Sequence, residues 1–365
     1  MKNRINGIEL LRIVLCLVVL LAHTTYITGQ TVLNGNFFHS SLAVELFYIL
    51  NGYFLFFKGK DENLDIKQYC VHLIIKLSPV IIFVTLLHCF LYNIHLINET
   101  FFRRNEFLNI LFIRDIGTNS FGLIPKSQNG FWSTNTHLWY LGPLFYVSLL
   151  YFYLQKTNKE NKFIFIVILI SCICFIEYNC LGKLKKLHYL IRGIFSIGFG
   201  IIFAGLTYKL DKEKINDICN KNYLIKVVIL FIELVICTDL YRALFKKFYT
   251  PNILMYFYII FALLVFDFIL NNNLLAKTIN KINFSKISKY TYCLYATQWI
   301  PQVLLANNNF IASTSYYKNF RTNYPVLELL FSFAVIVGFA IFTHNFIEKP
   351  SYKYLSTKLK KNENR

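Results

Sequence analysis

The sequence predicts an all-α, polytopic membrane protein with about ten transmembrane helices. Hydrophobic residues make up 56% of its 365 residues, and charged residues make up only 16%, against about 25% in a soluble domain. The apolar residues occur in continuous runs close to the roughly 20 residues that a helix needs to cross a bilayer. The 37 Phe and 25 Tyr could not stay solvated in a disordered chain. A water-soluble enzyme and a disordered protein are therefore both excluded.

Ten apolar segments are long enough to span a membrane, and each is expected to be a helix because backbone groups in lipid must pair with one another. They cover residues 8–28, 41–58, 71–97, 137–155, 163–181, 189–210, 223–241, 251–270, 286–306 and 325–347. The first segment is too long for a signal peptide, and no small-residue cleavage site follows it. We expect one membrane domain over residues 1–350 and a basic cytosolic tail over 351–365.

The formal net charge is +19, from 38 Lys and Arg against 19 Asp and Glu. In a soluble protein this excess would suggest nucleic acid, but in a membrane protein it indicates cationic loops that face an anionic leaflet. The cations concentrate on the side that holds both termini, which predicts a multi-pass plasma-membrane protein with cytoplasmic ends. The long segment 98–136 is then extracytoplasmic. We expect the lipid bilayer, and no nucleic acid, among the partners.

The nine cysteines form no recognisable framework. Most of them lie inside apolar runs, and no two have the CxxC spacing that is typical of redox and metal sites. We therefore interpret them as small buried hydrophobic residues, and we expect no metal.

Ionisable residues inside a span are costly, and they are therefore functional candidates. The first span holds Glu9, Arg12 and His23. Eleven positions at 100° per residue bring Arg12 and His23 to within about 20° of one face, roughly 16 Å apart along the axis. Two independent anchors, one snorkelling to each interface, would account for the two residues. A cavity lined by this face accounts for their alignment as well, and we favour it.

The second span contains Glu45, Asn51 and Gly52, and the seven positions from Glu45 to Gly52 place these two on one face. A carboxylate in the outer half of a span needs a partner, and His23 or an outer arginine is the natural candidate. A protonated Glu45 with a structural role is the alternative.

The third span carries Lys76 near its inner end, either as a snorkelling residue or as a phosphate contact. The fourth span enters from outside with His137, Trp139 and Tyr140. Trp and Tyr alone are typical of the interfacial aromatic belt, so the histidine beside them is the more specific signal.

The polar residues thus form two layers. The inner layer is cationic and suits a phosphorylated cytosolic ligand. The outer layer combines histidine with a carboxylate, which suits deprotonation of a hydroxyl group. The inner residues are Arg12, Lys67 and Lys76, and the outer residues are His23, Glu45 and His137.

An ordered set of blocks in this chain resembles the acyltransferase-3 family of integral membrane acyltransferases. The blocks are Arg12-x10-His23, the run from Glu45 to Asn51-Gly52-Tyr53, Lys76 with Pro79, His137-Leu138-Trp139-Tyr140-Leu141 and Glu348-Lys349-Pro350. Glu45 and Asn51 stand where the family usually has Asp and Ser, and Gln298 lies near the place of a frequent histidine. The resemblance extends over essentially the whole chain.

The resemblance implies transfer of an acyl group, most simply acetyl, from cytosolic acyl-CoA to a hydroxyl of an extracytoplasmic or lipid-linked glycan. Acyl-CoA (acetyl-CoA in the simplest case) is then a substrate, and no permanently bound cofactor is expected. Arg12 and Lys76 would bind this donor. His23 would act as the general base, with Glu45 fixing its tautomer, or as a transient acyl carrier. The residues expected to bind the acceptor or to support the site are Asn51, Gly52, His137, Trp139, Tyr140 and Glu348.

Some relatives carry a fused extracytoplasmic hydrolase-like domain, for which this sequence shows no counterpart. We therefore expect the protein to act alone, as a homo-oligomer, or with a separate extracytoplasmic partner. The alternative function is a glycan-lipid flippase or a polysaccharide exporter. A protein of that class would spread its charges through many spans, whereas here they concentrate in the first two and the fourth.

Overall fold

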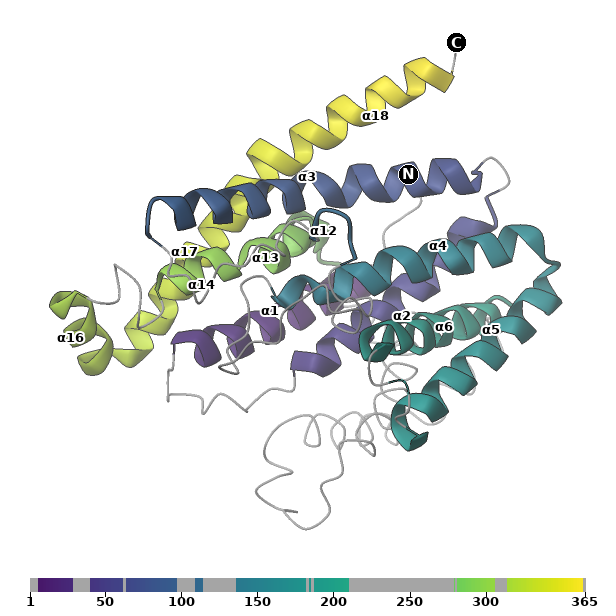
Figure 1. Cartoon of the computed structure of the whole chain (residues 1–365), viewed down its shortest axis with the longest axis horizontal. Helices are drawn as coiled ribbons and strands as arrows, with labels where there is room; N and C mark the ends of the chain where they lie inside the picture. Colours follow the sequence, from purple (N-terminus) through teal and green to yellow (C-terminus); the bar gives the residue numbers. More distant parts are fainter. Residues whose placement is uncertain are drawn as a thin grey trace.

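In the computed structural model, the described part of the chain consists of helices and short connections and contains no strand (Figure 1). The predicted all-α membrane fold is therefore confirmed as a class. The described residues are 6–28, 40–61, 64–96, 109–113, 136–181, 184, 187–209, 279, 281–305 and 314–363.

The described helices fall into two groups along the chain. The N-terminal group is α1 (Asn6–Thr28), α2 (Ser40–Gly59), α3 (Ile66–Asn93), the 3-10 turn η4 (Thr136–Tyr140), α4 (Leu141–Thr157), α5 (Glu160–Ile176), the π-helical turn η5 (Glu177–Leu181) and α6 (His188–Lys209). The C-terminal group is α12 (Ser285–Ser288), α13 (Thr291–Thr297), α14 (Trp299–Leu304), α16 (Ser315–Asn323), α17 (Pro325–Thr343), the π-helical turn η7 (His344–Glu348) and α18 (Lys349–Glu363).

Four stretches of described helix are long and apolar enough to cross a bilayer, namely Asn6–Thr24, Ile66–Asn93, His188–Tyr208 and Pro325–Leu359. Large apolar side chains point outward from the bundle, as contact with lipid tails allows. They include Leu86, Phe90, Phe165, Ile173 and Phe346. The predicted spans 223–241 and 251–270 lie outside the described residues, so the number of ten spans stays a prediction.

The predicted span 286–306 is wrong as a single helix. The structure divides it into α12, α13 and α14, with turns at 289–290 and at Gln298. Pro301 contributes to the second break because it has no N–H to donate to the carbonyl of Thr297.

The third span begins earlier than its hydropathy predicts, at Ile66, because a capping box starts α3. Asp65 Oδ1 accepts a 2.6 Å hydrogen bond from the backbone N–H of Gln68, and Gln68 Oε1 accepts one of 3.1 Å from the backbone N–H of Asp65. These two bonds satisfy N–H groups that the helix itself cannot pair. The residues from Ile66 to the start of the apolar run at 71 therefore belong to the same helix as that run.

Small residues let α2 and α6 approach closely. A Cβ on Gly52 would lie 1.9 Å from the carbonyl oxygen of Ile197, and a Cβ on Gly200 would lie 2.0 Å from the carbonyl oxygen of Ile49. Glycines at helix crossings in membranes permit this backbone contact. Near the C-terminal end of α2, the ring of Tyr69 on α3 stacks on Phe152 of α4, with centroids 4.1 Å apart.

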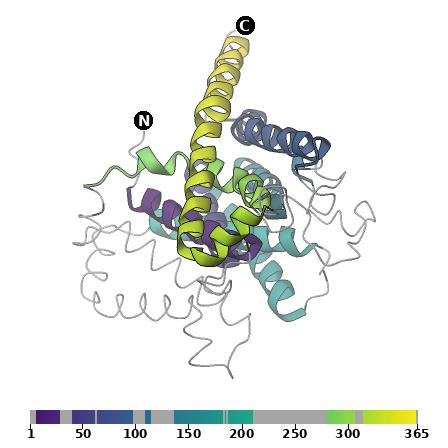
Figure 2. The same cartoon turned by 90° about the vertical axis from the view of Figure 1, so that its left-hand side faces the viewer.

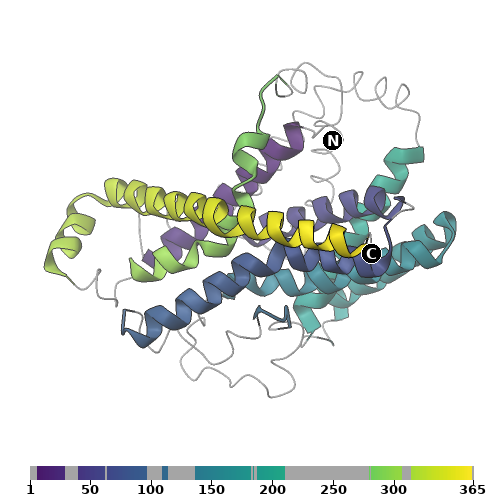
Figure 3. The same ribbon diagram turned by 90° about the horizontal axis from the view of Figure 1, so that it is seen from above.

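The broken segment α12–α14 packs along α1, and the two run in the same direction (Figure 3). Cys16 Sγ donates to the carbonyl of Thr291 at 3.5 Å, and further along both chains Gln302 Nε2 donates to Thr24 Oγ1 at 2.9 Å. This alignment carries residues of α13 and α14 to the depths of Arg12 and His23.

The chain end is helical rather than an extended tail. α17, η7 and α18 follow one another without a loop, and Figures 1 and 2 show them as one long rod whose end projects beyond the other helices. The expected tail over 351–365 is therefore helical as far as Glu363.

Candidate functional site

A cavity of about 500 Å³ lies between α1, α2, α3, α4 and the C-terminal group of helices. On α2 its wall runs from Phe47 to Lys58, about 16 Å of helix at 1.5 Å per residue. Lys58 lies at the α2–α3 connection, which the predicted topology places on the cytosolic side. The charged side chains in the wall are Arg12, Lys58, Lys76 and Lys289, with Glu9 and Glu348 as the acids.

The inner cationic layer predicted from sequence is partly brought together. Arg12 of α1 and Lys76 of α3 lie in the same wall, although 64 positions separate them (76 − 12 = 64). Lys67 is exposed and is not part of that wall. Lys58 and Lys289, which also line the cavity, add two cations to this layer.

Arg12 is held from two sides while part of it faces the cavity. Its Nη1 donates to Glu9 Oε1 at 3.4 Å, one turn earlier, and its guanidinium lies 5.2 Å from the ring centroid of Phe54 on α2. Glu9 also accepts a hydrogen bond from Ser288 Oγ of α12. The side chain of Arg12 is nevertheless 34% exposed. Glu9 therefore positions the guanidinium without enclosing it.

Aromatic residues form another part of the cavity wall. The rings of Tyr140 and Tyr295 meet edge to face with centroids 4.7 Å apart. The hydroxyl of Tyr292 donates to the carbonyl of Leu77 at 2.6 Å and so links α13 to α3. The cavity wall therefore combines cationic and aromatic side chains.

Of the expected supporting residues on α2, one lies in the cavity wall and the other in a helix crossing. Asn51 lines the cavity, and its Nδ2 donates to Ser148 Oγ of α4 at 2.7 Å. Gly52 faces the backbone of Ile197 on α6. The observed contact of Gly52 is therefore with a helix.

His23 lies beyond this wall, against the segment that joins α13 to α14. Its side chain interacts with that of Gln298, and its ring is perpendicular to Trp299 at a centroid distance of 6.4 Å. Gln298 Nε2 donates to the carbonyl of Tyr295 at 3.1 Å, one turn closer to the cavity. Gln298 thus links Tyr295, which lines the cavity, with His23.

The expected contact between Glu45 and His23 is not formed. Glu45 of α2 makes an ion pair with Arg192 of α6 and accepts a hydrogen bond from Ser196 Oγ. The arginine is the alternative partner that the sequence left open. The carboxylate of Glu45 therefore binds α6. The residue beside the imidazole of His23 is Gln298, where we expected Glu45.

Trp139 belongs to the surroundings of this ion pair. The guanidinium of Arg192 lies 4.9 Å from its ring centroid, a cation–π distance, and the ring of Tyr189 lies 4.4 Å away. His137 lies in η4, but its side chain is outside the described residues. Tyr140, the last residue of η4, is the one that reaches the cavity.

Among the predicted site residues, Arg12, Asn51, Lys76, Tyr140 and Glu348 share the cavity wall. Sequence reasoning did not single out several residues that accompany them. They include Lys58 and Lys289 in the wall, and Arg192, the partner of Glu45. Tyr292 and Tyr295 also line the cavity, and as uncharged residues in an apolar run they gave no comparable signal. A charge inside an apolar run was the available signal for Arg192, but its partner depends on tertiary packing.

Comparison with known protein families gives a match. A family model described as an acyltransferase domain matches residues 5–344, nearly the whole chain. No curated protein and no solved structure matches the chain. Together with the apolar helices, the family match shows a membrane acyltransferase. The chain belongs to the acyltransferase-3 family.

Proposed function

We propose that the protein transfers an acyl group, most simply acetyl, from cytosolic acyl-CoA to a hydroxyl group of an extracytoplasmic or lipid-linked glycan. The cavity carries this proposal. Its wall combines Arg12, Lys58, Lys76 and Lys289, and several cations in one concave wall attract a polyanionic ligand. The phosphates of CoA meet that requirement.

The size of the cavity suits a small-molecule donor. Its volume of about 500 Å³ falls inside the range of about 300–1,000 Å³ that is usual for small-molecule sites. The nucleotide phosphates would stay at the cationic side chains, and the narrow pantetheine arm would extend toward Tyr140 and Tyr295. The thioester would then lie on the side of the cavity nearest Gln298 and His23.

His23 is the proposed general base for the acceptor hydroxyl. Because Gln298 Nε2 already donates to the carbonyl of Tyr295, its Oε1 is the atom that can accept an N–H from the imidazole. That arrangement would leave the other ring nitrogen as a base. The hydroxyl oxygen would attack the thioester carbonyl carbon, its proton would pass to His23, and the CoA thiolate would leave.

Glu45 then acts at a distance from the chemistry. Its ion pair with Arg192 holds α2 to α6, and α2 carries the cavity residues Asn51 and Phe54. We therefore assign Glu45 and Arg192 as positioning residues for this wall.

Mass spectrometry of surface glycans from cells with and without the gene tests the proposal. Loss of the gene should remove an acyl modification from one glycan, and a plasmid copy should restore it. A copy with Arg12→Lys should restore little, whereas Arg321→Lys, on α16 and outside the cavity wall, should restore it fully. Identical glycan acylation with and without the gene would contradict the proposal.

A further inference from the structure

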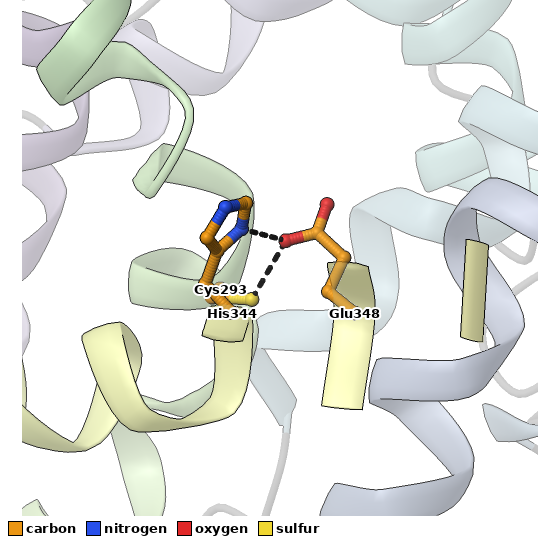
Figure 4. Close-up of side chains that lie close together, drawn as sticks. All are labelled: Cys293, His344 and Glu348. Atoms are coloured by element: carbon orange, nitrogen blue, oxygen red, sulfur yellow. Dashed lines mark hydrogen bonds and ion pairs between the residues drawn. The ribbon is translucent and has the colours of Figure 1, made fainter. Parts of the chain in front are cut away.

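A cluster of three side chains in the C-terminal group has the composition of a metal site. Cys293 comes from α13, and His344 and Glu348 come from the π-helical turn η7. Their ligand atoms all lie within 4.8 Å of one another. Figure 4 shows the thiol and the imidazole directed at the same carboxylate oxygen.

The contacts within the cluster are short. Cys293 Sγ lies 3.0 Å from Glu348 Oε2, and His344 Nδ1 lies 2.7 Å from that same oxygen. These distances are typical of hydrogen bonds to the carboxylate. Tetrahedral zinc with usual bond lengths needs ligand atoms about 3.4–3.6 Å apart. The third pair, Cys293 Sγ and His344 Nδ1, lies within 4.8 Å. Binding would therefore move the carboxylate oxygen outward and bring the sulfur and the nitrogen closer together, by shifts on the order of 1 Å.

We propose that Cys293, His344 and Glu348 bind a divalent transition-metal ion of the zinc type. Thiolate, imidazole and carboxylate are the ligand set of zinc, whereas magnesium and calcium prefer oxygen alone. On binding, the thiol proton leaves to solvent and the imidazole proton moves from Nδ1 to Nε2. The two negative charges of the thiolate and carboxylate then balance the ion.

The position of the cluster gives the ion an open coordination site. Cys293 is fully buried, whereas the side chains of His344 and Glu348 remain 12% and 17% exposed and line the cavity. Three protein ligands with one position left for water or a bound ligand is the pattern of reactive rather than purely structural zinc. This proposal does not depend on the identity of the acyl donor or acceptor.

The local backbone and the surrounding rings support a specific role. π-helical turns inside long helices occur frequently at functional sites, and η7 supplies both His344 and Glu348. The ring of Tyr290 packs edge-on against His344 with centroids 4.9 Å apart, which fixes the imidazole plane. Sequence spacing could not reveal the cluster, because 55 positions separate Cys293 from Glu348.

Cobalt substitution in the full-length protein tests this site directly. The tag-free protein would be purified in detergent, stripped with a chelator, and titrated with Co²⁺. We expect one equivalent per chain, with the near-ultraviolet charge-transfer absorption of a thiolate–cobalt bond, and displacement by Zn²⁺. Cys293→Ser should abolish that absorption. Cys16→Ser is the matched control, because Cys16 is equally buried but lies on α1 outside the cluster, and it should leave the absorption unchanged.

Two further variants keep the test decisive if Cys293→Ser does not fold. His344→Ala and Glu348→Gln retain the thiol and should each weaken Co²⁺ binding at least tenfold. Gel filtration would verify that every variant is monodisperse. Absence of a thiolate–cobalt band in the wild type, or an equal band in Cys293→Ser, would overturn the proposal whatever the acyl-transfer assays show.

Discussion

Glu45 of α2 and Arg192 of α6 form a buried ion pair whose side chains are only 4% and 8% exposed. Ser196 donates a further hydrogen bond to the carboxylate, and Trp139 covers the guanidinium. Charges at this depth persist only when paired, so the pair fixes which face of α2 meets α6. The opposite side of α2 is thereby turned toward the cavity.

Breaking this pair should destabilise the protein strongly. Removing one partner of a buried ion pair costs about 3–5 kcal/mol, because the other charge stays buried without compensation. We expect Glu45→Gln to lower the thermal unfolding midpoint in detergent by many degrees. Glu160→Gln is the control, because its pair with Lys60 is 27–37% exposed and such pairs contribute about 0–1 kcal/mol. Equal midpoints for the two variants would contradict the assigned role of Glu45.

The glycine contact between α2 and α6 makes a second prediction. Gly52→Ala would place a methyl group 1.9 Å from the carbonyl oxygen of Ile197, so the helices must separate. We expect a loss of about 1–3 kcal/mol, or more, in unfolding free energy. Gly338→Ala meets nothing within 4 Å on α17 and should be neutral or stabilising by about 0.5–1 kcal/mol. Gel filtration after heating would compare the thermal stability of the Gly52→Ala and Gly338→Ala variants.

Sequence alone predicted the class of fold and the inner charges because both are local signals. An apolar run marks a span wherever it packs, and Arg12 and Lys76 are visible as charges within such runs. The partner of Glu45 was not predictable, because His23 and Arg192 satisfy the same local requirement. The breaks in 286–306 were missed because the hydropathy of that segment is continuous, although Pro301 lies within it.

The donor site gives a third prediction. Arg12→Lys keeps the charge but loses the planar group that can bind two oxygens at once. A lost charge-assisted hydrogen bond is worth about 1.5–3 kcal/mol, so acyl-CoA should bind about ten- to a hundredfold more weakly. Isothermal calorimetry in detergent would measure it, with Arg321→Lys as the control. Glu9→Gln should have the smaller effect, since Glu9 positions Arg12 from the side. Unchanged affinity in Arg12→Lys would remove Arg12 from the donor site.

The predicted orientation can be tested on whole cells. Single cysteines at Ser120 and Asn364, in a background without native cysteines, would be exposed to a membrane-impermeant thiol reagent. The positive-inside rule predicts labelling at position 120 and protection at position 364. The reverse pattern would invert the topology and place Lys58 of the cavity wall on the outer side of the membrane.

Acyl transfer across the membrane by His23 is the central claim. Inside-out membrane vesicles present the cytosolic face to added acyl-CoA, so the assay is the incorporation of labelled acyl groups into lumenal glycan. A general base contributes about 10²–10⁴-fold, and glutamine can hydrogen-bond but cannot accept the proton. At equal protein level and equal acyl-CoA affinity, His23→Gln should therefore transfer at least about a hundredfold more slowly than the wild type. Transfer at the wild-type rate in His23→Gln would contradict the account.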